Sequence, residues 1–310
     1  MTVLFTSNRP LGRAENIHAV YDAYNGDKCF IQNNPWKFNP EMLSSEFTLR
    51  VTDELPSSSP GKCIMIGHGI AGGKTYGLDQ PHPYFKNENS HLIDFSITTS
   101  REMVGLVAKQ SGILPEQVLP LGMPRTDAYF GVHKGDGGTR FKDVRMYLYA
   151  PTFRTKEETP MPEIDWGYLD LCIPDGEVFV VKPHMVTKKI LHGRYRHIFE
   201  VSCNEPSTPY LIDCDVLITD YSSIMFDAHI LEKPVVLFEK NPGYLDSRGM
   251  YLEYPGGYSS RYCTNEYDLV KCMRSAYGQN KEDLKCLRTT AGACDGHSTE
   301  RVIELIGKMV

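Results

Sequence analysis

The sequence predicts an α/β protein of two successive domains that flank a cleft. Its 310 residues exceed the size of a typical single core, so two domains are expected. Short apolar runs alternate with helical patterns along the chain, which is typical of parallel sheets covered by helices. The glycine-rich stretch 133–138 is the best candidate for a flexible crossing. We therefore expect an N-terminal domain over residues 1–138 and a C-terminal domain over residues 139–310.

Each strand is predicted from a short run rich in β-branched and aromatic residues, and each helix from apolar residues at helical spacing. The elements expected in the first domain are strand 3–6, helix 14–24, strands 28–32, 63–66 and 95–98, helix 101–110 and strand 118–121. Those expected in the second domain are strands 145–149, 178–181, 198–201, 216–218 and 235–238, then helices 266–277, 281–289 and 298–309. We expect the last helix either to stay with the second domain or to pack back on the first.

Composition and charge restrict the class of protein. The net charge is −6 and no run of basic residues stands out, so binding to nucleic acid is not expected. The nine cysteines are scattered and never form a C-x-x-C pair, which predicts reduced thiols in a cytoplasmic protein. No window of about 18 residues is apolar throughout, so any membrane contact would be peripheral, at the inner face of the cell membrane.

The most informative stretch of the chain is 215–238, which reads as strand, polar turn, helix and strand. Its turn contains Asp220, Ser222 and Ser223, whose side chains suit the start of the following helix. Phosphate favours such a place, because backbone N–H groups and the positive end of the helix dipole point there. From these residues alone, an ordinary strand-to-helix turn with good capping chemistry is an equally weighted alternative.

A histidine follows the strand expected at 63–66, in the sequence Gly67-His68-Gly69. Two glycines leave its ring exposed, and a histidine at a strand end can take a proton from an attacking hydroxyl. An incidental histidine in a strand-ending turn is the alternative that these three residues alone favour. The nearby Lys74 does not belong to a P-loop, because the glycine spacing of that motif is not met.

Two further strand ends carry anion-binding side chains. Strand 178–181 leads into Lys182 and His184, which could neutralise a phosphate, and strand 145–149 is followed by Thr152 and Arg154. For the first pair, a lysine extending to solvent and a hydrogen-bonded loop histidine are an alternative of even weight. Anion-binding or acid–base side chains thus follow four predicted strands, 63–66, 145–149, 178–181 and 216–218. Their occurrence by chance at all four is improbable, so we expect them to form a binding site.

Taken together, these segments resemble the signatures of the CDP-glycerol glycerophosphotransferases of teichoic acid and capsule synthesis. The resemblance covers about residues 63–306. It rests on Gly67-His68-Gly69, the segments 121–127, 149–154 and 182–184, the stretch 217–227 and the segment 295–302.

This resemblance implies a GT-B fold, in which two Rossmann-like domains face each other across a cleft, with the nucleotide donor on the C-terminal one and no required metal or other cofactor. It implies that His68 is the catalytic base and that His184 acts at the donor phosphates. The donor-side residues are then Thr152, Arg154, Lys182, Asp220, Ser222 and Ser223. The acceptor-side residues are Gly69, Lys74 and Arg125.

The function implied is transfer of a polyol phosphate, with glycerol phosphate as the first expectation, from a CDP-activated donor. The acceptor would be a hydroxyl of a cell-wall or capsule glycan, free or lipid-linked, and CMP would be released. Two alternatives stay open: a GT-B glycosyltransferase that uses a nucleotide sugar, and a non-catalytic nucleotide-binding protein of the same fold. The polyol, the acceptor, the number of units added and the oligomeric state are not specified by the sequence.

Overall fold

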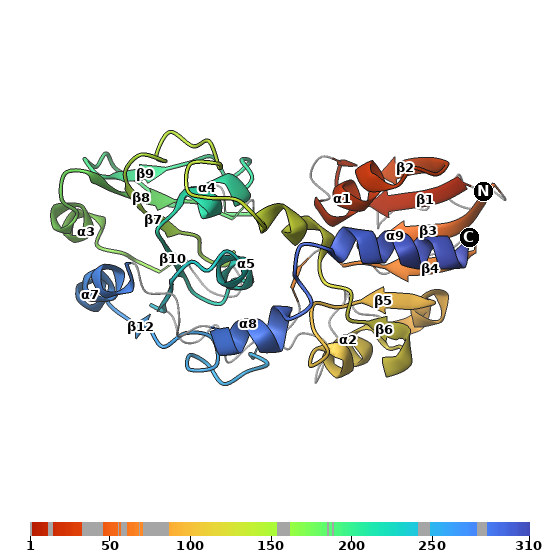
Figure 1. The fold of residues 1–310 in the computed structure, drawn as a ribbon. Helices are drawn as coiled ribbons and strands as arrows, with labels where there is room; N and C mark the ends of the chain where they lie inside the picture. The colour runs from red at the N-terminus through yellow and green to blue at the C-terminus, as the bar shows by residue number, and fades with distance from the viewer. Residues whose placement is uncertain are drawn as a thin grey trace. The chain divides into compact units, whose positions relative to one another are not determined.

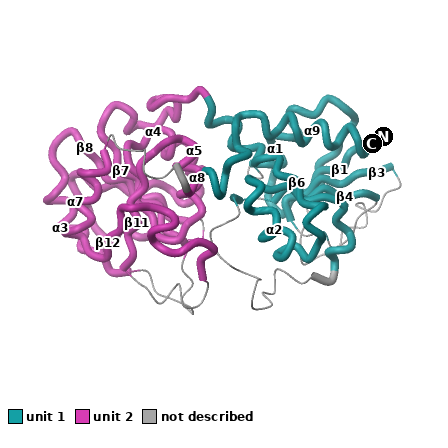
Figure 2. Tube along the Cα trace, turned by 60° about the horizontal axis from the view of Figure 1, so that its bottom comes forward, with its two compact units in different colours: residues 1–130, 288–310 teal, residues 131–287 magenta. Residues whose placement is uncertain are grey.

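The computed structural model describes residues 2–11, 15–32, 46–54, 56, 61–67, 69–70, 87–153, 162–184, 186–187, 189–240, 249–277 and 284–310. The chain divides into two compact units, one of residues 1–130 together with 288–310 and the other of residues 131–287 (Figure 2). Each unit contains a six-stranded sheet whose paired strands are parallel (Figure 1). The predicted α/β class with two domains is confirmed.

The sheet of the first unit has the strand order β2-β1-β3-β4-β5-β6. Its strands are β1 (Thr2–Ser7), β2 (Lys28–Gln32), β3 (Phe47–Thr52), β4 (Lys62–Met65), β5 (Phe95–Ile97) and β6 (Val118–Leu119). The helices of this unit are α1 (Glu15–Ala23), α2 (Val104–Ser111), α9 (Ser298–Met309) and the 3-10 helices η3 (Asn87–Leu92), η4 (Pro115–Gln117) and η5 (Pro124–Tyr129). Strand β3, in the middle of the sheet, was not predicted from the sequence.

The C-terminal helix α9 belongs to the first unit. Its Val302 and Ile306 are fully buried and share a hydrophobic cluster with Val3 and Phe5 of β1. Burial of this apolar face is the reason that the helix packs there. The observed division therefore differs from the expected one at residue 138. The first unit ends at residue 130 and is completed by residues 288–310.

The sheet of the second unit has the strand order β12-β11-β10-β7-β8-β9. Its strands are β7 (Arg145–Tyr149), β8 (Glu177–Val181), β9 (Ile198–Glu200), β10 (Val216–Thr219), β11 (Val235–Phe238) and β12 (Tyr262–Cys263). Its helices are α3 (Trp166–Cys172), α4 (Thr208–Asp213), α5 (Ile224–Ile230) and α7 (Glu266–Ala276), and α8 (Leu284–Ala291) runs across residues 287 and 288. The central strands β10 and β11 are buried along their whole length, as expected for a parallel sheet covered on both faces.

The glycine-rich segment that was expected to be a flexible crossing is fixed within the second unit. The backbone N–H groups of Gly135, Gly137 and Thr139 donate to the carboxylate of Asp213, at 2.9, 3.0 and 2.8 Å. A Cβ atom at Gly137 would lie 2.2 Å from the carbonyl oxygen of Pro209. The glycine is therefore required for close approach to α4 rather than for flexibility.

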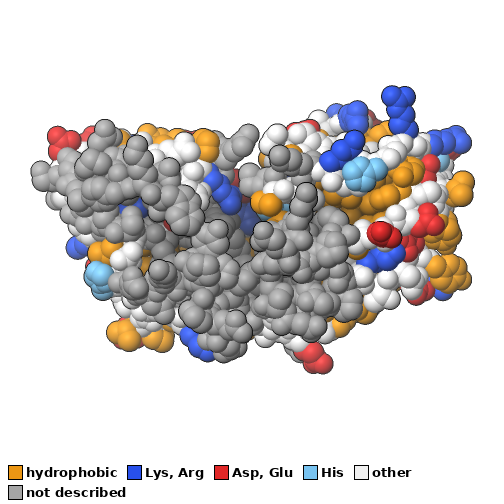
Figure 3. Space-filling view, turned by 180° about the vertical axis from the view of Figure 1, so that it is seen from behind, with side chains coloured by type: hydrophobic (Ala, Val, Ile, Leu, Met, Phe, Trp, Pro, Cys, Tyr) orange, Lys and Arg blue, Asp and Glu red, His pale blue; other side chains and the backbone are white. Residues whose placement is uncertain are grey.

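The surface of the described residues is mixed in character. Figure 3 shows basic, acidic and apolar side chains interspersed over the described part of one face. Within the described ranges, no helix has both the length and the apolar character needed to cross a membrane.

Asp213→Asn tests the role of this carboxylate. Burial opposes its charge, but the hydrogen bonds from Thr139, Gly135 and Gly137 outweigh that effect and lower the pKa of Asp213. An amide group would present N–H to backbone N–H donors, so we expect a loss of ~2 kcal/mol in the free energy of unfolding. Chemical denaturation at pH 7 measures it, with the exposed Asp143→Asn as control. Equal stability of the two variants would contradict the assignment.

Candidate functional site

The residues predicted to bind the donor phosphates follow three neighbouring strands. β10, β7 and β8 are adjacent and parallel, so their carboxyl ends lie at one edge of the second sheet. The described candidates are Thr152 after β7, Lys182 and His184 after β8, and Asp220, Ser222 and Ser223 after β10. Ligands of open α/β sheets bind outside the carboxyl ends of the strands. The structure thus brings these six residues to one edge.

Asp220 connects the ends of β10 and β7. Its side chain is 3% exposed, and Oδ1 accepts the backbone N–H groups of Thr152 and Tyr221, both at 2.7 Å. A second link is formed by the Thr219 hydroxyl, which donates to the carbonyl of Ala150 at 2.7 Å. The carboxylate is therefore used to shape this edge, and we assign to Asp220 the positioning of the two loops.

The two serines precede the short helix α5. Ser222 is half-buried and Ser223 is exposed. Ser223 occupies the N-cap position but has helical dihedral angles, φ −63° and ψ −11°, and its side chain makes no capping hydrogen bond. An N-cap hydroxyl reaches the helix N–H groups from an extended backbone, which explains the difference from the prediction. Ser223 thus lies at the edge without the capping role expected of it.

Lys182 is buried instead of extending to solvent. It is 6% exposed, and Nζ donates to the carbonyls of Pro183 at 3.0 Å and Cys203 at 3.3 Å. Burial lowers the pKa of Lys182, and the nearby Cys203 and Glu205 partly oppose this effect. Among the described residues, the hydrogen bonds of this ammonium group go to neutral carbonyls, and an anionic ligand would add opposite charge to that of the nearby Glu205.

His184 has one ring nitrogen directed to the backbone. Nδ1 accepts the N–H of Val186 at 3.2 Å, so the neutral ring carries its proton on Nε2. The ring also lies 5.2 Å from the Phe153 ring, measured between centroids. The contact with Val186 therefore selects the tautomer in which Nε2 is a hydrogen-bond donor.

The first unit contains the predicted acceptor-side residues that are described, Gly69 and Arg125. Gly67 has φ +63°, a left-handed conformation that favours glycine, and this turn follows β4. The Arg125 guanidinium donates to the Tyr129 hydroxyl at 3.0 Å, and its Nε is 3.8 Å from the Glu15 carboxylate. The carbonyl of Gly67 and the backbone N–H of Arg125 are both bound by Asn16, a residue that the sequence did not indicate.

Three predicted residues, His68, Lys74 and Arg154, lie outside the described residues. Their assignments stay predictions. Where side chains are described, no group of three or more histidine, cysteine, aspartate or glutamate residues is suited to hold a metal ion.

Comparison with known proteins identifies the family. Residues 40–308 match the model of the CDP-Glycerol:Poly(glycerophosphate) glycerophosphotransferase family. The chain belongs to this family. The resemblance inferred from the sequence motifs is thereby confirmed, and so is the enzyme class that it implies.

Curated relatives of this glycerophosphotransferase act in teichoic acid synthesis. A teichoic acid glycerol-phosphate primase of Bacillus subtilis is 24% identical over 288 residues, which are 88% of this chain and 75% of the relative. A teichoic acid poly(ribitol-phosphate) polymerase of Bacillus spizizenii is 27% identical over 265 residues. That match covers 78% of this chain but only 42% of the polymerase.

Solved structures share the fold of the glycerophosphotransferase chain. The wall teichoic acid polymerase TagF superposes with a TM-score of 0.78 at 20% identity, over 99% of this chain and 88% of that chain. A protein of Listeria monocytogenes described as a UDP-N-acetylglucosamine 2-epimerase superposes with a TM-score of 0.64 at 12% identity. The match covers 99% of this chain and 96% of that chain. The two parallel-sheet units and these likenesses confirm the GT-B type of fold.

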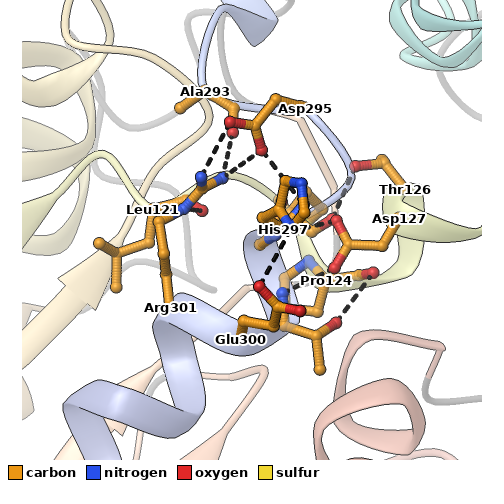
Figure 4. Close-up of polar contacts among 12 residues, drawn as sticks. Leu121, Pro124, Thr126, Asp127, Ala293, Asp295, His297, Glu300 and Arg301 are labelled. Carbon is orange, nitrogen blue, oxygen red and sulfur yellow. Dashed lines mark hydrogen bonds and ion pairs between the residues drawn. The ribbon is translucent and has the colours of Figure 1, made fainter. Parts of the chain in front are cut away.

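The segments 121–127 and 295–302, which carry part of the resemblance to the family, contact each other at the start of α9 (Figure 4). The carboxylate of Asp127 accepts the backbone N–H groups of Ser298 at 3.0 Å and Thr299 at 2.7 Å. A carboxylate there satisfies N–H groups that a helix start leaves unpaired, and it complements the helix dipole. The segment 121–127 thereby anchors the helix that completes the first core.

Arg301 of α9 adds further hydrogen bonds between the same two segments (Figure 4). Its guanidinium donates to the carbonyls of Leu121 at 2.9 Å and Ala293 at 2.6 Å, and it pairs with Asp295 at 2.9 and 2.7 Å. The hydrogen bonds with Arg301 lower the pKa of Asp295. The segment 295–302 therefore has a structural role in the glycerophosphotransferase.

Glu54 is a titratable group at the edge of the first sheet that sequence reasoning missed. It follows β3, and Thr52 of this strand pairs with Met65 and accepts the N–H of Ile66 at 2.7 Å, just before the Gly67 turn. Burial, assisted by the charge of Asp53, raises the pKa of Glu54 to about 7, against the opposing effects of Arg9 and Arg50. No local motif distinguishes this carboxyl group from the other glutamates of the chain.

Glu54→Gln should change how stability depends on pH. The folded-state pKa exceeds that of the unfolded chain, so protonated Glu54 stabilises the fold at low pH and this contribution is lost as pH rises through about 7. Glutamine imitates the neutral form. We expect similar stability of variant and wild type at pH 5 and an advantage of the variant at pH 8. Allowing for solvent screening of this partly exposed group, the advantage is about 1 kcal/mol. Thermal unfolding measures it, with the exposed Glu102→Gln as control. A pH-independent difference would contradict the assignment.

Proposed function

We propose that this protein transfers a polyol phosphate, with glycerol phosphate as the first candidate, from a CDP-activated donor to a hydroxyl of a cell-wall glycan or its lipid-linked precursor. The observation that carries the proposal is the match of residues 40–308 to the glycerophosphotransferase family. One curated relative is a teichoic acid glycerol-phosphate primase, and others are ribitol-phosphate polymerases. Both polyols therefore belong in the tests.

The donor diphosphate binds in this proposal at the carboxyl edge of the second sheet. The buried ammonium of Lys182, the Nε2–H of His184 and the hydroxyls of Ser222 and Ser223 supply positive charge and hydrogen-bond donors there. Arg154 follows β7 in sequence and adds a guanidinium to this set. These groups offset the charge of the leaving CMP, so the proposal includes no resident metal ion.

The reaction is an in-line displacement at the β-phosphorus. His68 takes the proton of the acceptor hydroxyl, whose oxygen forms the new P–O bond. The bond from the β-phosphorus to the bridging oxygen breaks, and its electron pair leaves with CMP. One solved structure of TagF is of a variant with a histidine replaced by asparagine, soaked with CDPG. We take this as support for testing a histidine as the base in this protein.

The acceptor approaches from the first unit in this proposal. Gly69 and Lys74 follow the histidine in sequence, and Arg125 is held by Tyr129 and Glu15. We also infer that the enzyme acts in the cytoplasm, with peripheral contact at the inner face of the membrane if the acceptor is lipid-linked.

Release of CMP from CDP-glycerol tests the proposed activity. With a glycan or lipid-linked acceptor, we expect wild-type turnover that persists after dialysis against a chelator. His68→Ala should lower kcat at least 100-fold, because a positioned general base contributes about 10²–10⁴-fold. Donor binding should be retained, as measured by calorimetry. The exposed His18→Ala is the control. Unchanged turnover of His68→Ala would refute the base assignment, and absence of wild-type turnover with any CDP-polyol would refute the function.

Thermal stabilisation by nucleotides tests the donor. A ligand at 100 times its Kd stabilises the folded state by about 2.7 kcal/mol. We expect stabilisation by CDP-glycerol and CMP but not by UDP-sugars, and its loss in Lys182→Met, which keeps the aliphatic chain and removes the charge. Lys189→Met, at an exposed position of the same unit, should respond like wild type. Preference for UDP-sugars would instead favour the glycosyltransferase alternative.

A further inference from the structure

We propose that Asn16 is a positioning residue that holds Gly67, the residue before the proposed base His68 in sequence, against the segment that contains Arg125. This inference rests on the proposed function, because it assigns to Asn16 an effect on the catalytic step. Asn16 precedes residues 40–308, the part of the chain that matches the family model. It is the second residue of α1 and is 2% exposed.

Both ends of the Asn16 amide bind backbone groups of other segments. Nδ2 donates to the carbonyl of Gly67 at 3.0 Å, and Oδ1 accepts the N–H of Arg125 at 3.0 Å. Nδ2 also lies 2.7 Å from the sulfur of Met123. The short amide side chain of asparagine supplies both the donor and the acceptor without a charge.

The bond to Gly67 acts on the peptide group that leads into His68. Gly67 already has a left-handed conformation, and its carbonyl orientation fixes the plane of the peptide bond that follows. Without the Asn16 donor, a glycine on each side of the histidine leaves the backbone many accessible conformations. Asn16 therefore restricts the turn at the residue that immediately precedes the proposed base.

The bond to Arg125 connects this turn to the acceptor side. Arg125 is held through its backbone by Asn16 and through its guanidinium by Tyr129 and by Glu15, the neighbour of Asn16 on α1. Its side chain is 11% exposed. The first turn of α1 thus fixes two segments that the proposed reaction uses together. Displacements of about 1 Å can cost about 10²-fold in rate when they misalign a reacting group.

The alternative is that Asn16 merely satisfies two buried backbone groups of the first unit. That role predicts a loss of stability, and a loss of activity only in proportion to the unfolded fraction. The positioning role predicts a loss of kcat in fully folded protein. It also predicts an unchanged KM for CDP-glycerol, because the donor binds in the second unit according to the proposed function.

The test compares Asn16→Asp with Val20→Ala. The aspartate keeps an acceptor for the Arg125 N–H but places a carboxylate oxygen against the Gly67 carbonyl. Val20 is fully buried on the same helix, so its truncation lowers the melting temperature of the protein and leaves the amide contacts of Asn16 intact. We expect Asn16→Asp to lower kcat at least tenfold, with KM for CDP-glycerol within twofold of wild type, and Val20→Ala to keep wild-type kcat at a temperature where both are folded.

Equal kcat of Asn16→Asp and wild type would overturn the inference while leaving the proposed function intact. A drop in kcat shared by Val20→Ala would also overturn it, because stability alone would then explain the loss. If Asn16→Asp does not fold, Asn16→Ser replaces it, since serine leaves space for water at both backbone groups, and the same separation of kcat from KM is expected. Failure of wild-type enzyme to release CMP from any CDP-polyol would overturn the proposed function and this inference with it.

Discussion

The buried carboxylate of Asp220 is the interaction on which the proposed donor site depends. Parallel strands bring their carboxyl ends to one edge, but the loops that follow must still satisfy their backbone N–H groups. Asp220 accepts two of these, from Thr152 and Tyr221, and so joins the loops after β7 and β10. Strand β8, which precedes the basic groups Lys182 and His184, pairs with β7 beside these joined loops.

Both units contain a carboxylate that accepts several backbone N–H groups. Asp213 accepts three backbone N–H groups of the segment 135–139, and Asp127 accepts two at the start of α9. Hydrogen bonds from several backbone N–H groups stabilise the charged form of a carboxylate, and here they also fix the loops that donate them.

The sequence predicted most of the sheet elements because they are short apolar runs bounded by turn residues. Strands β7 and β11 and helix α9 have the predicted limits. Strand β3 was missed because Arg50, fully buried, interrupts its apolar pattern. Helix α4 was missed because it is short and has a proline, Pro209, in its first turn.

The edge of the second sheet was predictable because each candidate follows a strand. Hydrogen bonds between residues that are far apart in the sequence could not be predicted. Nothing near Asn16 in sequence indicates that its amide binds Gly67 and Arg125, which are 51 and 109 residues away. The raised pKa of Glu54 likewise depends on burial by distant segments. The glycine-rich segment was interpreted from composition, whereas its conformation is set by Asp213.

The position of α9 has a consequence for synthesis of the chain on the ribosome. Residues 131–287 are contiguous, so that unit can form its core while translation continues. The other unit contains β1 at one end of its sequence and Val302 and Ile306 at the other. Its core stays incomplete, with Val3 and Phe5 lacking those neighbours, until residues 298–309 have emerged. Chaperone contacts during translation should therefore concentrate on the nascent N-terminal sheet.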